Sequence, residues 1–481
     1  MRRRAARRLV LLAAAVGVLV VLPAAAAAHP LGNFTINQYS GLRVDRSRVE
    51  VDYVVDMAEI PAFQTRQDID RDGDGTLSAA EADGWQRAAC LRLAKGLRLR
   101  LDGRPLALAV TGGRLTFPPG AGALPTLRLE CPLAAGTGAP GGTHALDYAD
   151  GNFADRIGWR EITAAGDGTS LAASDAPTGS VSQRLTRYPQ DLLRAPLNQR
   201  AARLEFRPGG ARLAGSGPAT AGRAAVPLGV DRATRAFTAL VARQHLGLAF
   251  GLGAAGLALL LGAVHALAPG HGKTVMAAYL LGLRGSLRQA LLVGLTVTAT
   301  HTAGVLALGI ALSASSALAP ERLYPWLGLA SGLLLTSIGV GLLRRALRAR
   351  RGGTHHDHGH DHDHDHGHDV PARPSWRSLV SMGFAGGLVP SPSALIVLLG
   401  AIAIGRAWFG VLLVVAYGAG MAATLTGAGL ALVRARSAVD RWAAGPRRPG
   451  LAALGRALPV GTATLIVLVG LFLAARGASA V

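Results

Sequence analysis

The stretch His265-Ala-Leu-Ala-Pro-Gly-His271-Gly-Lys273 stands at the end of a long apolar run and decides how the C-terminal half of the chain folds. Apolar runs rarely carry ionisable side chains, because a charge at bilayer depth costs roughly 3 kcal/mol or more on insertion scales. Two imidazoles and a lysine in such a place therefore indicate a functional site. Pro269 interrupts the helix there, so the two histidines can approach each other across a break.

Apolar runs continue outward from this stretch to the C-terminus. Spans of roughly 20 such residues fit a bilayer, and they lie near 246–268, 289–313, 324–343, 379–404, 409–433 and 459–475. The segment 272–283 is too short to cross and is expected to re-enter. Six transmembrane helices divided three plus three predict two halves of inverted orientation, 245–343 and 378–481. The second half has its own break, Gly386-Gly-Leu-Val-Pro390-Ser-Pro392-Ser393.

The formal net charge of +21 is explained by membrane orientation. The arginines gather at the ends of apolar runs, where the positive-inside rule expects them. Those at 284–288, 344–351 and 434–456 are all cytoplasmic if the N-terminal part of the chain lies outside. We therefore expect a multi-pass plasma-membrane protein that contacts lipid and binds no nucleic acid.

The first 210 residues differ in composition from the rest. Arginines followed by an apolar core and Ala26-Ala-Ala28 predict a signal peptide over 1–28, with an uncleaved anchor as the alternative. Alternating residues predict a hairpin about Asp45–Arg48 and another about Asp102–Pro105, with further strands near 126–131, 144–148, 158–163 and 202–206. Residues 29–210 are thus expected to form an extracytoplasmic β-sandwich-like domain with one helical insertion, followed by a linker over 211–244.

Cys90 and Cys131 are the two cysteines of the chain, and both fall in this domain. An oxidising compartment favours a disulfide between them. Two separate buried thiols are the alternative.

The segment 70–81 matches the whole EF-hand loop pattern, with a glycine at the sixth position and a leucine at the eighth. Extracellular calcium is plentiful, so a single loop is expected to bind Ca²⁺ structurally; the alternative is a loop that keeps this shape without metal. The expected ligands are Asp70, Asp72, Asp74, Thr76 through its carbonyl, Ser78 and Glu81.

The membrane-spanning half offers imidazoles and hardly any carboxylates. Between His245 and Trp442, Glu321 and Asp440 are the acidic residues outside a histidine-rich loop. Imidazole suits nickel, cobalt, zinc or copper, whereas calcium and magnesium require oxygen ligands. The predicted transport site comprises His265, His271 and His301, supported by Lys273, Thr298, Thr302, Ser391 and Ser393. The alternative is that these histidines only bond neighbouring helices.

The loop over 344–377 is rich in histidine and aspartate and is expected to lie in the cytoplasm. Such a tract can chelate borderline transition metals before export, or it is simply a solvated linker. Its predicted ligands are His355, His356, His358, His360, His362, His364, His366 and His368.

Three short motifs together resemble signatures of the nickel/cobalt transporter (NicO) family, and the likeness is greatest to its nickel/cobalt efflux branch. They are His-Ala-Leu-Ala-Pro-Gly-His-Gly-Lys-Thr at 265–274, Thr-His-Thr at 300–302 and Gly-Gly-Leu-Val-Pro-Ser-Pro-Ser-Ala at 386–394. The resemblance covers about 245–475. It implies a six-span transporter whose motif histidines are His265, His271 and His301. High-affinity uptake relatives carry an aspartate where Gly270 stands, which leaves the preferred metal open.

These observations predict export of nickel and/or cobalt, with no organic cofactor. Uptake by the same scaffold and a membrane metal sensor are the alternatives. An intramembrane metalloenzyme is disfavoured, because the chain lacks H-E-x-x-H and a suitable carboxylate. Assembly as a homo-oligomer stays open.

Overall fold

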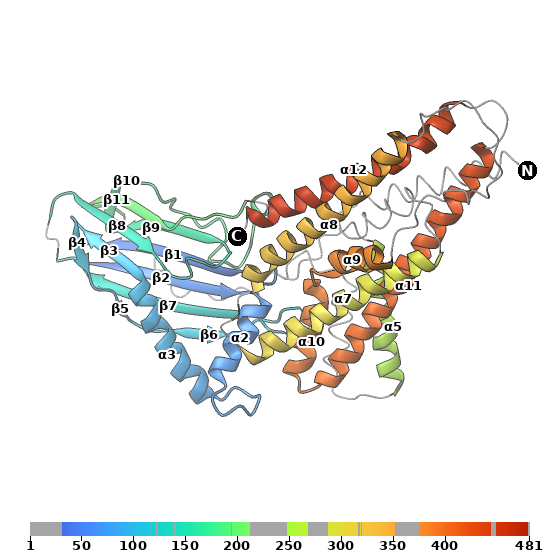
Figure 1. The fold of residues 1–481 in the computed structure, drawn as a ribbon. Helices are drawn as coiled ribbons and strands as arrows, with labels where there is room; N and C mark the ends of the chain where they lie inside the picture. The colour runs from blue at the N-terminus through green and yellow to red at the C-terminus, as the bar shows by residue number, and fades with distance from the viewer. Residues whose placement is uncertain are drawn as a thin grey trace, which may run out of the picture.

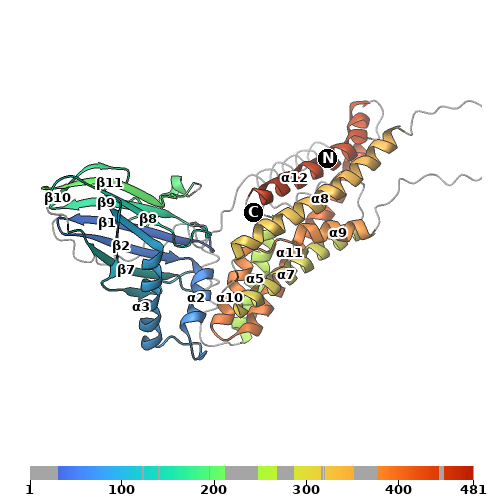
Figure 2. The same cartoon turned by 60° about the vertical axis from the view of Figure 1, so that its left-hand side comes forward.

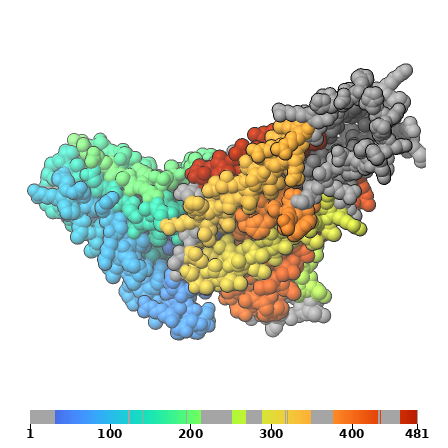
Figure 3. All heavy atoms as spheres, viewed as in Figure 1, coloured from blue at the N-terminus to red at the C-terminus, as the bar shows by residue number. Residues whose placement is uncertain are grey.

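The computed structural model describes residues 31–121, 124–138, 141–193, 195–211, 248–267, 287–315, 318, 320–351, 376–443 and 449–479. The predicted signal peptide and re-entrant segment lie outside these residues, as do nearly all of the predicted linker and residues 352–375 of the predicted histidine-rich loop. The predicted bounds of that loop, 344–377, are too wide, because residues 344–351 continue a helix and 376–377 begin the next one. The described chain forms two adjoining lobes, a sheet-rich N-terminal domain and a bundle of apolar helices (Figure 1; Figure 3).

The N-terminal domain contains two β-sheets. The six-stranded sheet has the order β5-β7-β2-β1-β9, with β6 also paired to β7, and the five-stranded sheet has the order β10-β11-β8-β3-β4. The strands are β1 (Ile36–Asp45), β2 (Arg48–Met57), β3 (Leu97–Leu101), β4 (Arg104–Leu106), β5 (Ala109–Val110), β6 (Arg114–Thr116), β7 (Leu127–Gly136), β8 (His144–Asp150), β9 (Arg160–Asp167), β10 (Thr169–Ser174) and β11 (Ala201–Pro208). One apolar core includes inward-facing residues of both sheets, among them Val51, Leu129, Leu146 and Phe206.

The first predicted hairpin is confirmed, and the second is only partly right. Val44 pairs with Val49 across the β1–β2 turn, as the alternation of apolar and charged residues predicts. The second arm of that hairpin, expected to run from Leu106 to Val110, is not one strand, because the chain leaves the sheet that contains β3 after Leu106. Its last part, β5, pairs with β7 in the other sheet. Strand β10 was not predicted, since its mostly small residues, half of them exposed, give no alternating pattern.

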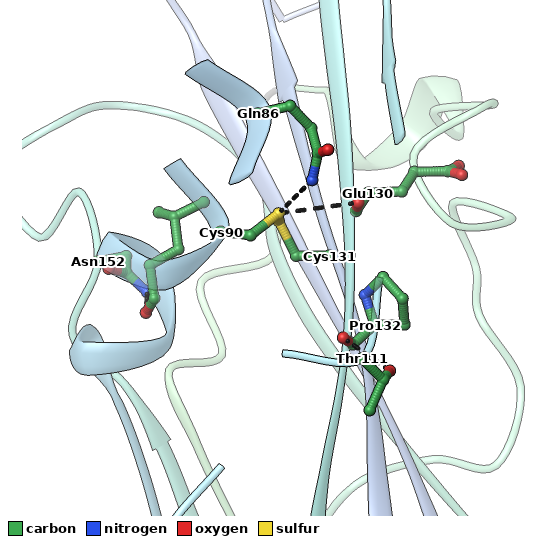
Figure 4. Close-up of a disulfide and its surroundings, with 8 residues drawn as sticks. Gln86, Cys90, Thr111, Glu130, Cys131, Pro132 and Asn152 are labelled. Carbon is green, nitrogen blue, oxygen red and sulfur yellow. Dashed lines mark hydrogen bonds between the residues drawn. A yellow bond between two sulfur atoms is a disulfide. The ribbon is translucent and has the colours of Figure 1, made fainter. Parts of the chain in front are cut away.

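The helical insertion consists of α2 (Glu59–Ile69), the loop over 70–78 and α3 (Ala79–Gly96). A capping box between Ser78 and Glu81 begins α3. Cys90 of α3 and Cys131 of β7 form a disulfide that fastens this helix to the sheet (Figure 4). Both cysteines are fully buried, and the Gln86 amide donates a hydrogen bond to the sulfur of Cys90, 3.4 Å away.

The helical lobe contains α5 (Leu248–Leu267), α7 (Leu287–Ala314), α8 (Pro320–Arg351), α9 (Trp376–Gly387), α10 (Pro392–Ala403), α11 (Ala407–Ala443) and α12 (Pro449–Ala478). Within the described residues, α7, α8, α11 and α12 are each long and apolar enough to cross a membrane. Helices α9 and α10 count as a fifth span if taken together, and α5 is a shorter apolar helix. The expected apolar segment over 379–404 is interrupted at the predicted break, where α9 and α10 meet at an angle of 67°.

Small residues allow the helices of the two sequence halves to approach closely. An added Cβ at Gly332 of α8 would lie 2.4 Å from the backbone nitrogen of Ala474 on α12, and one at Gly470 would lie 2.6 Å from that of Thr336. Helix α7 packs on α9 and α10, and α11 packs on α5. Helix α7 of the first half thus contacts the interrupted segment α9–α10 of the second half, and α11 of the second half contacts α5 of the first. Glycine-lined interfaces favour such close packing in membranes.

Removal of the disulfide is expected to destabilise the N-terminal domain. The cross-link joins residues 41 apart, and a loop of this size is worth about 3–4 kcal/mol in the chain-entropy model. The double substitution Cys90→Ala/Cys131→Ala should lower the free energy of unfolding by that amount. Denaturant-dependent hydrogen exchange of the β1 and β2 amides in the full-length protein measures it. Reductant should destabilise the native protein and leave the double variant unchanged; equal stability of the two proteins contradicts the prediction.

Candidate intramembrane site

His301 lies in the middle of α7 and is 6% exposed. Its Nε2 accepts a hydrogen bond from the backbone amide of Ser391, 3.3 Å away, and lies 3.2 Å from the Ser391 hydroxyl. An amide can only donate, so this contact assigns a lone pair to Nε2 and the ring proton of a neutral imidazole to Nδ1. A neutral imidazole with an accepting nitrogen is the form that binds transition metals.

The break between α9 and α10 brings Ser391 to His301. Ser391 caps α10 without a side-chain capping bond, and Pro392 begins the helix. The Ser391 hydroxyl therefore faces His301 and does not cap its own helix. On the other side of the break, the hydroxyl of Ser331 on α8 donates a hydrogen bond of 2.8 Å to the carbonyl of Ala385 in the last turn of α9. The negative end of one half-helix and the positive end of another thus meet at the same place.

Glycine lets the break lie directly on α7. A Cβ at Gly387 would be 2.3 Å from the carbonyl oxygen of Val297 and 3.1 Å from the backbone nitrogen of His301. A Cβ at Gly383, one turn earlier, would be 2.7 Å from the Cβ of Thr296. Both positions therefore require glycine for α9 to approach this closely.

His265 reaches the same region from α5. Its ring centroid is 5.9 Å from that of His301 and 5.6 Å from that of Tyr417 on α11. The Tyr417 hydroxyl also interacts with the hydroxyls of Ser391 and Ser393. Sequence reasoning missed Tyr417, because a single tyrosine in an apolar helix carries no motif. The only available signal was its neighbour Gly418, which permits close packing.

The two predicted threonines lie on the side of α7 that faces α11. A Cβ at Gly418 would be 2.5 Å from the Thr302 hydroxyl oxygen and 3.3 Å from the Thr298 methyl carbon. The Thr298 hydroxyl is buried, and no described residue offers it a hydrogen bond. An orphaned buried hydroxyl is costly unless a water or ion satisfies it.

The structure therefore assembles part of the predicted site. His265, His301, Thr298, Thr302, Ser391 and Ser393 gather around the α9–α10 break, whereas His271 and Lys273 lie outside the described residues. The described ranges add no third histidine, cysteine or carboxylate to the two histidines. Glu321 lies instead at the start of α8, where it forms an ion pair with Arg156 of the N-terminal domain.

The EF-hand-like loop has the geometry that its pattern predicts. One carboxylate oxygen from each of Asp70, Asp72 and Asp74 lies within 4.8 Å of the others. Gly75 adopts a φ of +82°, as the sharp turn at the sixth loop position requires. Hydrogen bonds from the hydroxyl and amide of Ser78 and from the amide of Arg71 lower the pKa of Glu81 to about 2. This carboxylate is thus charged and directed back toward the loop.

Comparison with known proteins matches less than half of the chain. Residues 251–375 match the NicO family, described as high-affinity nickel-transport protein. A putative nickel/cobalt efflux system of Methanocaldococcus jannaschii is 32% identical over 216 residues, which are 45% of this chain and 89% of that protein. The chain belongs to the NicO family. The nickel/cobalt efflux system RcnA of Escherichia coli K12 is 32% identical over 256 residues, 46% of this chain and 91% of the relative.

Membership of a transporter family and several apolar helices together establish a multi-pass membrane protein. RcnA of Citrobacter koseri is likewise 32% identical and covers 46% of this chain. No solved structure matches the chain. The family resemblance inferred from the short motifs is thereby confirmed, and the N-terminal domain is no part of the family match.

Close contact between α5 and α11 is expected to be essential for the site. A Cβ at Gly420 would lie 1.9 Å from the carbonyl oxygen of Leu259, whereas one at Gly427 on the same helix would meet nothing within 4 Å. Gly420→Ala should therefore force the helices apart and lower the yield and melting temperature of detergent-extracted protein. Gly427→Ala is the matched control and should be neutral or stabilising by up to about 1 kcal/mol. Equal behaviour of the two variants contradicts the close packing.

Proposed function

We propose that this protein exports nickel and/or cobalt ions across the plasma membrane through a site built on His265, His301 and His271. The observation that carries the proposal is the approach of His265 and His301, whose rings lie 5.9 Å apart although they belong to different helices. Imidazole nitrogens suit these two metals. The names of the family's efflux members support the same cargo and direction.

The chemistry of the site favours transient binding. Neutral nitrogen ligands do not compensate the charge of a divalent ion, so bound metal is held less tightly than in a carboxylate-rich site. The ion must also replace Ser391 at Nε2 of His301, since the two compete for one lone pair. Thr298, whose buried hydroxyl no described residue satisfies, would offer an oxygen ligand or hold a water. Ready release is what a transporter requires.

Alternating access would arise from movement between the inverted halves. His265 and His301 belong to the first half, whereas Tyr417 and Ser391 belong to the second. The site would therefore change when one half rocks against the other. We propose six spans, with α5 and the segment after it completing the first half, and an ion gradient as the energy source.

The N-terminal domain would lie outside the cell. The helix ends with the arginine clusters, namely the start of α7, the end of α8, the end of α11 and the start of α12, lie away from the sheets (Figure 1). With these ends in the cytoplasm, the positive-inside rule is satisfied. The histidine-rich loop, which joins α8 to α9, would then collect metal on the cytoplasmic side before export.

The EF-hand-like loop would bind one Ca²⁺ through Asp70, Asp72, Asp74, the Thr76 carbonyl, Ser78 and Glu81. Hard oxygen ligands on a helix-loop-helix frame support calcium at this place. This site is separate from the transport site and would brace the insertion that also carries the disulfide.

Substitution of the intramembrane histidines tests the transport proposal. His265→Ala or His301→Ala should abolish most metal export, because each removes a nitrogen ligand. Efflux of ⁶³Ni from loaded cells of a deletion strain should fall at least tenfold. Ser381→Ala is the control, because its exposed hydroxyl bonds only the carbonyl of Arg377 in its own helix. Undiminished efflux in both histidine variants would refute the site, and higher nickel in cells that express the native protein would indicate uptake.

Calcium is expected to stabilise the full-length protein. A ligand present at a hundredfold excess over its Kd adds about 2.7 kcal/mol to the stability of the state that binds it. The melting temperature in detergent should rise with added Ca²⁺, and Asp72→Ala should remove the rise. Asp68→Ala, on the exposed face of α2 just outside the loop, should retain it. Melting that ignores calcium in the native protein would exclude the site.

A further inference from the structure

Helix α2 of the N-terminal domain lies beside the membrane helix α10 (Figure 2). Ile60 and Phe63 of α2 belong to one buried apolar cluster with residues of α7 and α10. The partners from the membrane helices are Leu308, Leu312, Leu395, Ile396 and Leu399. This cluster shows that the domain is packed onto the bundle and does not merely adjoin it.

Polar contacts fix the same helix in place. Gln64 is buried, and its side-chain amide donates to the carbonyls of Leu318, at 2.7 Å, and Ser315, at 3.2 Å. Gln67 donates to the carbonyl of Ser313 at 3.1 Å. These carbonyls belong to the end of α7 and the connection that follows, where helical partners are lacking. Helix α2 therefore satisfies backbone groups of the membrane lobe.

Further contacts join the domain to the start of α8. Arg156 forms an ion pair with Glu321, and Asp155 forms one with Arg322. The rings of Phe34 and Tyr324 lie 5.3 Å apart. Ion pairs and a ring contact thus add to the apolar cluster of Ile60 and Phe63 in joining the two lobes.

Helix α10 connects this docking surface to the histidine site. It has twelve residues and is about 18 Å long at 1.5 Å per residue. Ser391, immediately before it, hydrogen-bonds His301, and Leu395, Ile396 and Leu399 lie in the cluster with α2. One short, rigid element therefore contacts the N-terminal domain along its side and His301 at its beginning.

We propose that Ile60, Phe63 and Gln64 are positioning residues for metal transport. By holding α10 against α7, they keep Ser391 at Nε2 of His301 and so set how readily metal displaces it. At the break the peptide chain continues but the helix does not, so no helical turn before Pro392 fixes the first end of α10 and its placement depends on side contacts. The N-terminal domain supplies these contacts and thereby acts on the site without touching it. The inference rests on the proposed function for its consequence in transport.

Hydrogen exchange of the full-length protein tests the positioning without metal. Phe63→Ala should increase exchange at least fivefold for amides of α10 and leave α12 unchanged, because α12 lies outside the contact. Phe63→Leu should restore most protection, and Asp68→Ala on the exposed face of α2 should have no effect. Gln64→Leu provides a second route if Phe63→Ala does not fold. Unchanged protection of α10 in a folded variant would overturn the proposal.

A double-mutant cycle in proteoliposomes tests the link to His301. Phe63→Ala should shift the KM for Ni²⁺ at least threefold, with a smaller change in kcat. In a Ser391→Ala background, which removes the hydroxyl contact with His301 and retains the amide bond, the same substitution should have a smaller effect. Fully additive effects would overturn the positioning role. The two proposals can fail separately. If the native protein transported no nickel but Phe63→Ala still increased amide exchange in α10, the transport proposal would fail, and the positioning of α10 by the N-terminal domain would stand.

Discussion

A helix break inside a bilayer depends on hydrogen bonds from protein, because lipid tails offer none. The break between α9 and α10 meets this constraint on both sides. Ser331 of α8 donates to the Ala385 carbonyl, and His301 of α7 accepts from the Ser391 amide. The imidazole that we propose as a metal ligand is therefore also part of the support for the break. In that proposal, a metal that binds Nε2 of His301 displaces the Ser391 amide from it.

Close helix packing follows from the same constraint. Apolar side chains gain little by leaving lipid for another apolar surface, so helices associate through close contact and hydrogen bonds. Three glycines each bring two backbones together where a side chain would collide. Gly387 of α9 faces α7, Gly420 of α11 faces α5 and Gly470 of α12 faces α8. These contacts place His265, His301 and Tyr417 around one break. The glycine content of the chain is thus part of the architecture of the site.

The N-terminal domain packs against this bundle of membrane helices. Its α2 helix covers apolar residues of α7 and α10 and satisfies carbonyls where α7 ends. The relatives match less than half of this chain, and the family match covers residues 251–375 of the helical part. The domain's interface with α10 is the route by which, in our proposal, it acts on an interior site through one short helix.

The sequence by itself determined the local features. Apolar run length, the Pro390–Pro392 interruption, the β1–β2 hairpin and the EF-hand-like spacing are set by neighbouring residues, and they could be predicted. His265 and His301 were found because imidazoles are costly in apolar runs. Tyr417, the Ser331 contact and the docking of α2 on α10 could not be found this way. They are decided by which surfaces meet in three dimensions, and residues as distant in sequence as Gln64 and Leu318 become partners only when the helices and sheets are packed.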